Sequence, residues 1–305
     1  MVFERRVRVS LVDDFGGLDV LPRLRFLIAP AALYMGWRRF RSLPPEKKRA
    51  ASKMVNRLFE WAERSGLIEK NPGFRTDYLR DYPELEILER NTETIRRECL
   101  ALLGAKDQIT DMEDLGGSYT SGGIHAIGWK TFMFKSGTFI EENCALAPET
   151  ARLLRGIPGA YTVFFSILDP HQYVRPHWGY YKGFLRYHLG IVIPNNNDDR
   201  TCFLRVNDSE QDNAVRDKSL IERGEKHYWR NGEGVLFDDI FLHDADNGSD
   251  EVRVVLWLDL ARKMPLALDL VNRAALWIAF RDPSVKQVRE NAVVRPATGV
   301  ASPVG

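Results

Sequence analysis

Several features that mark particular classes of protein are scarce or missing in these 305 residues. There are only three cysteines, far apart and odd in number, which favours a reducing compartment over a disulfide framework. No apolar run is long enough to cross a membrane, and the charged N-terminus is not a signal peptide. With a net charge of +1 and no basic stripe, nothing indicates a nucleic-acid polymer as partner. We expect a cytoplasmic protein without a transmembrane segment. The sequence does not determine its oligomeric state.

The most apolar run, Phe26–Trp37, is interrupted by Pro30 and followed by several arginines. A weaker alternative is therefore that this run rests on a membrane surface. The sequence also contains no internal repeat. Its helical region is therefore not a repeat array of the kind that binds long protein substrates, and a small or carrier-bound metabolite is at least as well supported as a substrate.

What the sequence does contain begins with a mainly helical region. Residues 43–65 have a helical pattern, with Ser42 as a candidate cap and Gly66 at the end. Six side chains fall on one stripe of this helix, which we expect to pack in the core: Ala51, Met54, Val55, Leu58, Phe59 and Ala62. Further helices are expected at Thr92–Leu103 (capped by Asn91 or Thr92), Ala147–Leu154 and Leu266–Phe280.

Short strands dominate from about residue 128. They are expected at Trp129–Lys135, Tyr161–Leu168, Gln172–Pro176, Phe184–Ile193, Thr201–Val206, Gly234–Phe237 and Val252–Leu260. Many short strands separated by turn signals favour a barrel or jelly roll. We predict a helical region at 1–127 packed on the core, a β core at 128–264, and a C-terminal helix with a flexible tail at 265–305.

The strand Phe184–Ile193 has two unlike faces. Leu185, Tyr187, Leu189 and Ile191 share one face, whereas Phe184, Arg186, His188 and Gly190 share the other. The second face either meets water or lines a polar cavity. Because that face has no Lys, Glu or Asp and His177 is near, the cavity is favoured.

The strand Val252–Leu260 presents a similar problem. Arg253 leads a face that is otherwise mostly apolar. A buried arginine needs an anionic partner. A protein carboxylate could serve, and so could a bound carboxylate ligand, which a guanidinium grips bidentately.

Two histidines are candidate metal ligands. His177 is expected just after one strand and His243 just after another. Neighbouring strands of a jelly roll would bring the two imidazoles together, and such a pair can hold a first-row metal ion. Arg253 would then lie deeper in the same barrel, where it could grip the far carboxylate of a ligand that chelates the metal.

These residues stand in motifs that resemble the aspartyl/asparaginyl β-hydroxylase family of Fe(II)- and 2-oxoglutarate-dependent oxygenases. The matching motifs, between about Trp129 and Met264, are FSILDP, VRPHWG, FLRYHLGIVIP, NGEGVLFDD, FLHDADN and VRVVLWLDL. The resemblance implies a double-stranded β-helix (jelly-roll) fold, mainly β with α. It also implies Fe(II) on His177 and His243, with O2 as co-substrate. By the same resemblance, 2-oxoglutarate is held by Ser166, Arg186, His188 and Arg253.

Gly179 departs from the metal-binding pattern of many related oxygenases. Those enzymes have a carboxylate at this position as the third iron ligand, and glycine has none. The open position is compatible with water, as in a hydroxylase, or with chloride, as in a radical halogenase. A carboxylate of Asp238, Asp239 or Asp244 is a further alternative, but each is more often a structural partner.

The resemblance implies that the protein hydroxylates an unactivated C–H bond of an amino-acid-like or other small metabolite, free or carrier-bound, releasing succinate and CO2. A halogenase at the same iron site is the first alternative, and a non-catalytic cupin-like binding module is the second. Four residues after the first histidine form either a packed turn or a wall that faces substrate: Trp178, Tyr180, Tyr181 and Lys182.

Overall fold

The computed structural model describes residues 34–39, 41–116 and 128–294. The chain divides into two compact units, residues 1–43 and residues 44–305. In the first unit residues 34–39 are helical, and the apolar run Phe26–Trp37 lies mostly outside the described ranges. Within those ranges, no helix combines the length and the apolar character that crossing a bilayer requires. The site lies in the second unit, to which the rest of this description applies.

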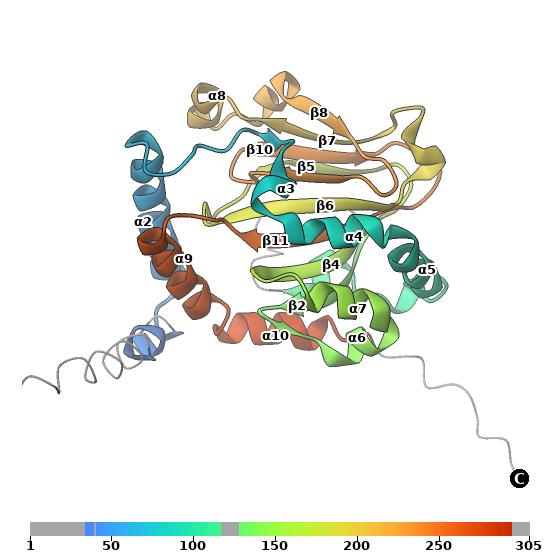
Figure 1. The fold of residues 1–305 in the computed structure, drawn as a ribbon, viewed down its shortest axis with the longest axis horizontal. Coiled ribbons are helices and arrows are strands. Elements are labelled where there is room, and N and C mark those ends of the chain that lie inside the picture. The colour runs from blue at the N-terminus through green and yellow to red at the C-terminus, as the bar shows by residue number, and fades with distance from the viewer. Residues whose placement is uncertain (1–33, 40, 117–127, 295–305) are drawn as a thin grey trace, which may run out of the picture. The chain divides into compact units, whose positions relative to one another are not determined.

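Two antiparallel sheets form the centre of the second unit (Figure 1). The large sheet has the order β1-β9-β6-β11-β4-β2-β3 and the small sheet the order β5-β10-β7-β8. The strands of the large sheet are β1 (Phe74–Arg75), β2 (Trp129–Ser136), β3 (Thr138–Phe139), β4 (Ala160–Leu168), β6 (Phe184–Val192), β9 (Gly234–Phe237) and β11 (Arg253–Ala261). Those of the small sheet are β5 (Gln172–Trp178), β7 (Cys202–Asn207), β8 (Glu225–Tyr228) and β10 (Leu242–Asn247).

Helices surround this centre. They are α2 (Pro45–Arg64), α3 (Tyr78–Asp81), α4 (Glu86–Arg90), α5 (Thr92–Leu103), α6 (Glu141–Leu146), α7 (Pro148–Arg155), α8 (Glu210–Val215), α9 (Leu266–Ala279) and α10 (Pro283–Asn291). Apolar residues of α4, α5 and α7 pack on the outer face of the large sheet. Its inner face packs against the small sheet. Two facing antiparallel sheets of this kind make a double-stranded β-helix, so the predicted fold class is confirmed.

The two unlike faces of β6 and β11 follow from these layers. Leu185, Tyr187 and Leu189 of β6 belong to the apolar core beneath the helices. So do Val254, Leu256, Leu258 and Leu260 of β11. Because side chains alternate along a strand, His188 and Arg253 point to the other face, between the sheets. The interpretation of that face as the wall of a cavity, rather than as surface, is confirmed for His188, which lines a cavity there together with Arg253.

The helix α2 differs from its prediction at two points. Its last residue is Arg64, and Gly66, expected to end it, follows the C-cap Ser65 with a φ of +69° that suits glycine. Ser42 does not cap it; the Ser42 hydroxyl donates to the carbonyl of Arg39, at 2.9 Å. Met54, expected in the core, is 69% exposed. The side chains of Asn91 and Thr92 likewise make no capping bond to α5, because both donate back to carbonyls of the preceding turn.

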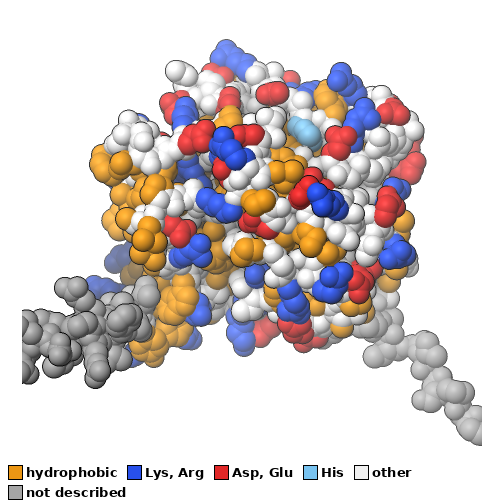
Figure 2. Space-filling view, in the orientation of Figure 1, with side chains coloured by type: hydrophobic (Ala, Val, Ile, Leu, Met, Phe, Trp, Pro, Cys, Tyr) orange, Lys and Arg blue, Asp and Glu red, His pale blue; other side chains and the backbone are white. Residues whose placement is uncertain are grey.

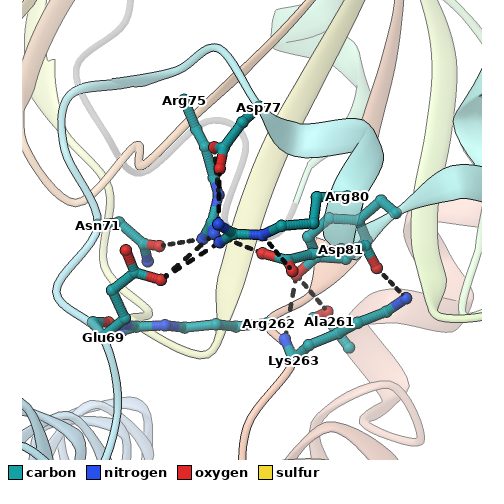
Figure 3. Close-up of polar contacts among 10 residues, drawn as sticks. Glu69, Asn71, Arg75, Asp77, Arg80, Asp81, Ala261, Arg262 and Lys263 are labelled. Carbon is teal, nitrogen blue, oxygen red and sulfur yellow. Dashed lines mark hydrogen bonds and ion pairs between the residues drawn. The ribbon is translucent and has the colours of Figure 1, made fainter.

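Hydrogen bonds join the segment that follows α2 to the end of β11 and the residues just after it (Figure 3). The Tyr82 hydroxyl donates to the carbonyl of Ala261, at 3.3 Å, and accepts from the amide of Lys263, at 3.0 Å. Arg262 forms an ion pair of 2.7 Å with Glu63 of α2 and also donates to the carbonyl of Glu69. These buried and half-buried polar contacts hold α2 and the segment after it to the β core.

Candidate active site

Two histidines face each other on neighbouring strands of the small sheet. His177 of β5 and His243 of β10 are direct antiparallel partners, and their ring centroids lie 4.1 Å apart. Both were expected just after a strand, but each lies within one, because β5 continues to Trp178 and β10 begins at Leu242. The structure does bring the two side chains together.

Backbone carbonyls determine which ring nitrogen of each histidine carries hydrogen. Nδ1 of His177 lies 2.8 Å from the carbonyl oxygen of Arg175, and Nδ1 of His243 lies 2.8 Å from that of Phe241. Because a carbonyl can only accept, each Nδ1 donates and each Nε2 keeps a lone pair. Burial lowers the pKa of His177 to about 4 and that of His243 well below its usual value, so both rings are neutral at pH 7. Two such imidazoles suit a first-row metal ion.

A carboxylate lies beside the position where a third ligand was considered. A Cβ atom added to Gly179 would come within 2.6 Å of Cγ, Oδ2 and the carbonyl oxygen of Asp239. The amide of Gly179 also donates to that carbonyl, at 2.7 Å. A side chain at residue 179 therefore has no room. In the described part of the chain, no group of three or more His, Cys, Asp or Glu residues is placed to hold a metal ion, so the two histidines are without a third protein ligand there.

Arg186 holds Asp239 in place. Its Nη2 lies 2.8 Å from Oδ2 of Asp239, and its Nε lies 2.9 Å from Oδ1 of Asp259. Its guanidinium also stacks 3.9 Å from the centre of the Trp257 ring. Burial raises the pKa of Asp239 to about 7, although Arg186 acts in the opposite direction. Arg186 thus has protein carboxylates as partners, and its assignment to 2-oxoglutarate stays a prediction.

Arg253 is in a different situation. It is 3% exposed, and its Nε has no hydrogen-bond partner among the residues that the structure describes. No ion pair joins it to a carboxylate in those same ranges, and its guanidinium lies 4.5 Å from the centre of the Trp229 ring. Burial lowers the pKa of Arg253 to about 10, which still leaves it charged at pH 7. A buried cation without a carboxylate is costly unless an anionic ligand binds it.

Other polar groups beside Arg253 are also unsatisfied. Both ring nitrogens of the buried His188 and Nε1 of Trp229 lack partners within the described ranges. The Ser166 hydroxyl accepts from Nε1 of Trp129, at 3.0 Å, which leaves its own hydrogen free to donate. With Arg253 they surround one cavity between the sheets. It is lined by Trp129, Ser166, Val174, His177, His188, Leu204, Trp229, Phe237, His243, Asp244, Ala245, Arg253 and Trp257.

The four residues considered as a substrate-facing wall lie in three different environments, outside the cavity between the sheets. Tyr181 and Lys182 are buried against the α2 side of the molecule: the Tyr181 hydroxyl donates to Asn272, and Lys182 pairs with Glu63 at 3.0 Å. Nε1 of Trp178 donates to Asn213, at 2.8 Å, and Tyr180 is 66% exposed. None of the four lines the cavity between the sheets.

Two features of this site were not predicted. Trp229 follows β8, a short polar strand that no period-2 pattern marks, so its place beside Arg253 depends on tertiary structure. The contact between Asp239 and Gly179 depends on the turn before β10. The only signal of it in the sequence is the glycine itself.

Comparison with known proteins assigns the chain to a family. Residues 89–263, more than half of the chain, match the sequence pattern of aspartyl/asparaginyl β-hydroxylase. The chain belongs to the aspartyl/asparaginyl β-hydroxylase family. The resemblance carried by the motifs around His177 and His243 is thereby confirmed at the level of family.

Relatives of this chain differ in how much of it they match. An ornithine lipid ester-linked acyl 2-hydroxylase of Rhizobium tropici is 28% identical over 254 residues, which cover 81% of this chain and 82% of that protein. Human aspartate β-hydroxylase domain-containing protein 2 is 30% identical, covering 58% of this chain and 44% of its own. Human aspartyl/asparaginyl β-hydroxylase is 28% identical, covering 59% and 21%. This chain thus spans less than half of either human relative. Because relatives of this chain are named as hydroxylases, the chain is an enzyme of the hydroxylase type.

Proposed function

We propose that this protein is an Fe(II)- and 2-oxoglutarate-dependent hydroxylase. The observation that carries the proposal is the buried guanidinium of Arg253, which has no carboxylate partner in the described ranges and shares a cavity with the His177–His243 pair. A dianion that reaches from the histidines to Arg253 would satisfy it. 2-Oxoglutarate has this shape, with a chelating end and a distal carboxylate.

The residues divide into two groups. His177 and His243 would hold iron through Nε2, and their Nδ1–H groups, bonded to backbone carbonyls, keep the rings in that orientation. Arg253, with His188 and Ser166, would bind the distal carboxylate. When bound, iron and 2-oxoglutarate would activate O2, the oxidant, so that one of its oxygen atoms converts a C–H bond into an alcohol and the other enters succinate, which is released with CO2.

The surroundings of Gly179 support hydroxylation over halogenation. The carboxylate of Asp239 lies where a third protein ligand would project. A chloride ion in that place would meet a neighbouring carboxyl group, whereas water can donate a hydrogen bond to it. Arg186 orients this carboxyl group, which makes it a positioning residue.

The substrate that we propose is an acyl chain carried by a lipid. Support comes from the Rhizobium tropici relative, which matches this chain along most of both lengths and is named as an acyl 2-hydroxylase. The human relatives named for aspartate match 58% and 59% of this chain and less than half of their own length. A lipid-linked fatty acid thus replaces, in this proposal, the amino-acid-like or other small metabolite expected from the sequence.

The first test is an absorption spectrum of the protein with Fe(II) and 2-oxoglutarate under anaerobic conditions. We expect a visible metal-to-ligand charge-transfer band, and none for His243→Ala. His171→Ala is the matched control, because the exposed imidazole of His171 bonds only Asp250 in the described ranges. With air and an acyl lipid, succinate and a hydroxylated chain should form in equal amounts. A wild-type protein without the band would contradict the proposal.

A further inference from the structure

The outer surface of α2 and α9 carries large apolar side chains that are exposed. On α2, Met54 is 69% and Trp61 52% exposed. On α9, Leu266 is 74% and Leu270 57% exposed. Figure 2 shows hydrophobic side chains gathered on the left of the molecule, over the place where Figure 1 draws these two helices. The helices also contact each other through a shared apolar cluster, so this is one surface.

The same surface carries positive charge. Lys53, Arg57 and Arg64 are exposed on α2, around Met54 and Trp61, and the exposed acidic residue among them is Glu60. A helix with Trp and Met beside Lys and Arg has the composition of helices that lie in the interface of a bilayer with anionic headgroups.

The inner face of α2 reaches the loop that follows His177. The Asn56 side chain donates to the carbonyl of Tyr180 and accepts from the amide of Lys182, both at 2.9 Å. Glu63 forms an ion pair of 3.0 Å with Lys182, in addition to its ion pair with Arg262. One helix therefore has its outer face in solvent and its inner face on a loop that begins next to the proposed iron site.

We propose that α2 and α9 form a docking surface for a lipid bilayer with anionic headgroups. The apolar side chains of this surface, named above, enter the headgroup region, and the cations of α2 bind the phosphates. Docking brings an acyl chain leaving the bilayer to the loop after His177. This last step rests on the proposed function, whereas docking itself does not.

Docking can be tested by sedimentation of the 305-residue chain with vesicles, in the absence of iron and 2-oxoglutarate. We expect binding to vesicles of phosphatidylcholine with phosphatidylglycerol, weaker binding to phosphatidylcholine alone, and a loss on adding salt. The double variant Leu266→Ser/Leu270→Ser should bind at least about tenfold more weakly. Lys53→Gln/Arg57→Gln should lose about fivefold for each cation.

Matched controls lie on α4 and α5. Ile87 and Leu100 are 42% and 47% exposed, so Ile87→Ser/Leu100→Ser removes similar apolar surface away from the docking face. Arg90→Gln/Arg97→Gln removes two exposed cations there. Circular dichroism melting confirms folding. If the leucine variant unfolds, the charge variant still tests whether this surface docks on vesicles, because it alters only exposed side chains.

Three results would overturn the docking surface. One is a wild-type protein that does not bind the anionic vesicles. Another is equal loss of binding in the test and control variants. The third is sedimentation of Leu266→Ser/Leu270→Ser as a smaller oligomer than the wild type, which would assign the face to a second copy of this chain. Failure of the proposed function is separate, because it would appear as a missing charge-transfer band in protein that still binds vesicles.

Discussion

Asp239 lies against Gly179, so close that a Cβ atom at residue 179 would be 2.6 Å from two atoms of the Asp239 carboxyl group and from its backbone carbonyl oxygen. Gly179→Ala should therefore be destabilising, by about 1–3 kcal/mol, because the contact includes backbone that cannot move away freely. Urea unfolding measures this loss. Adding Asp239→Ala should recover part of it, since the carboxyl group is removed and the carbonyl oxygen remains. Fully additive effects of the two substitutions would mean that the residues do not touch.

Asp239 should also make stability depend on pH. Its folded-state pKa, which burial raises from 3.8 to about 7, means that the folded protein binds a proton more readily than the unfolded chain between these values. Stability from this group is thus present below about pH 4 and is lost as the pH rises through about 7, by at most about 1.4 kcal/mol per pH unit.

The Asp239→Asn variant, which does not titrate, isolates this dependence. Urea unfolding at pH 5 and pH 8 should show that the variant loses less stability than the wild type over this interval. Glu251→Gln is the control, because Glu251 is exposed. The same pH slope in wild type and Asp239→Asn would show that the carboxyl group ionises freely in the folded state.

Arg253 and Arg186 allow a paired test, because both are largely buried but only Arg186 has protein carboxylates as partners. Arg253→Met should weaken 2-oxoglutarate binding by about 2–5 kcal/mol. The protein without ligand should stay as stable or gain stability, because an unpaired buried charge is removed.

Arg186→Met should have the opposite signature. It leaves Asp239 and Asp259 without their cation, so unfolding should become easier by about 3–5 kcal/mol at pH 7. Thermal unfolding and anaerobic 2-oxoglutarate titration measure the two effects. A purely ligand-binding defect in Arg186→Met would restore the role predicted for Arg186 from the sequence.

The parts of this fold that sequence patterns predicted are those where a strand has one buried apolar face. In β6 and β11 the alternation of Leu with Arg or His identified both the strands and the side that lines the cavity. β10 was not predicted as a strand, because Leu242–Asn247 contains three polar residues after His243 that pair with the neighbouring strand instead of packing in an apolar core.

Local sequence patterns could not predict which side chains pair with each other across the fold. The rule that a buried arginine needs an anion applied to Arg186 and Arg253 alike, and only the fold shows that Asp239 and Asp259 reach the first. Met54 falls on the apolar stripe of its helix, but the buried part of that stripe is narrower and is centred on Phe59 and Ala62. Helical periodicity gives the direction of a buried face and not its width.

Asn56 should position the loop after His177, because one amide group bonds both the carbonyl of Tyr180 and the amide of Lys182. Asn56→Ala leaves two partly buried backbone groups without these bonds, so we expect a stability loss of about 1–3 kcal/mol in thermal unfolding. Because the loop starts beside His177, anaerobic Fe(II) titration should also show weaker binding. Ser52→Ala is the control, since the hydroxyl of Ser52 bonds only within α2. Unchanged iron affinity in Asn56→Ala, despite the loss of stability, would show that α2 supports the fold without positioning the metal ligand.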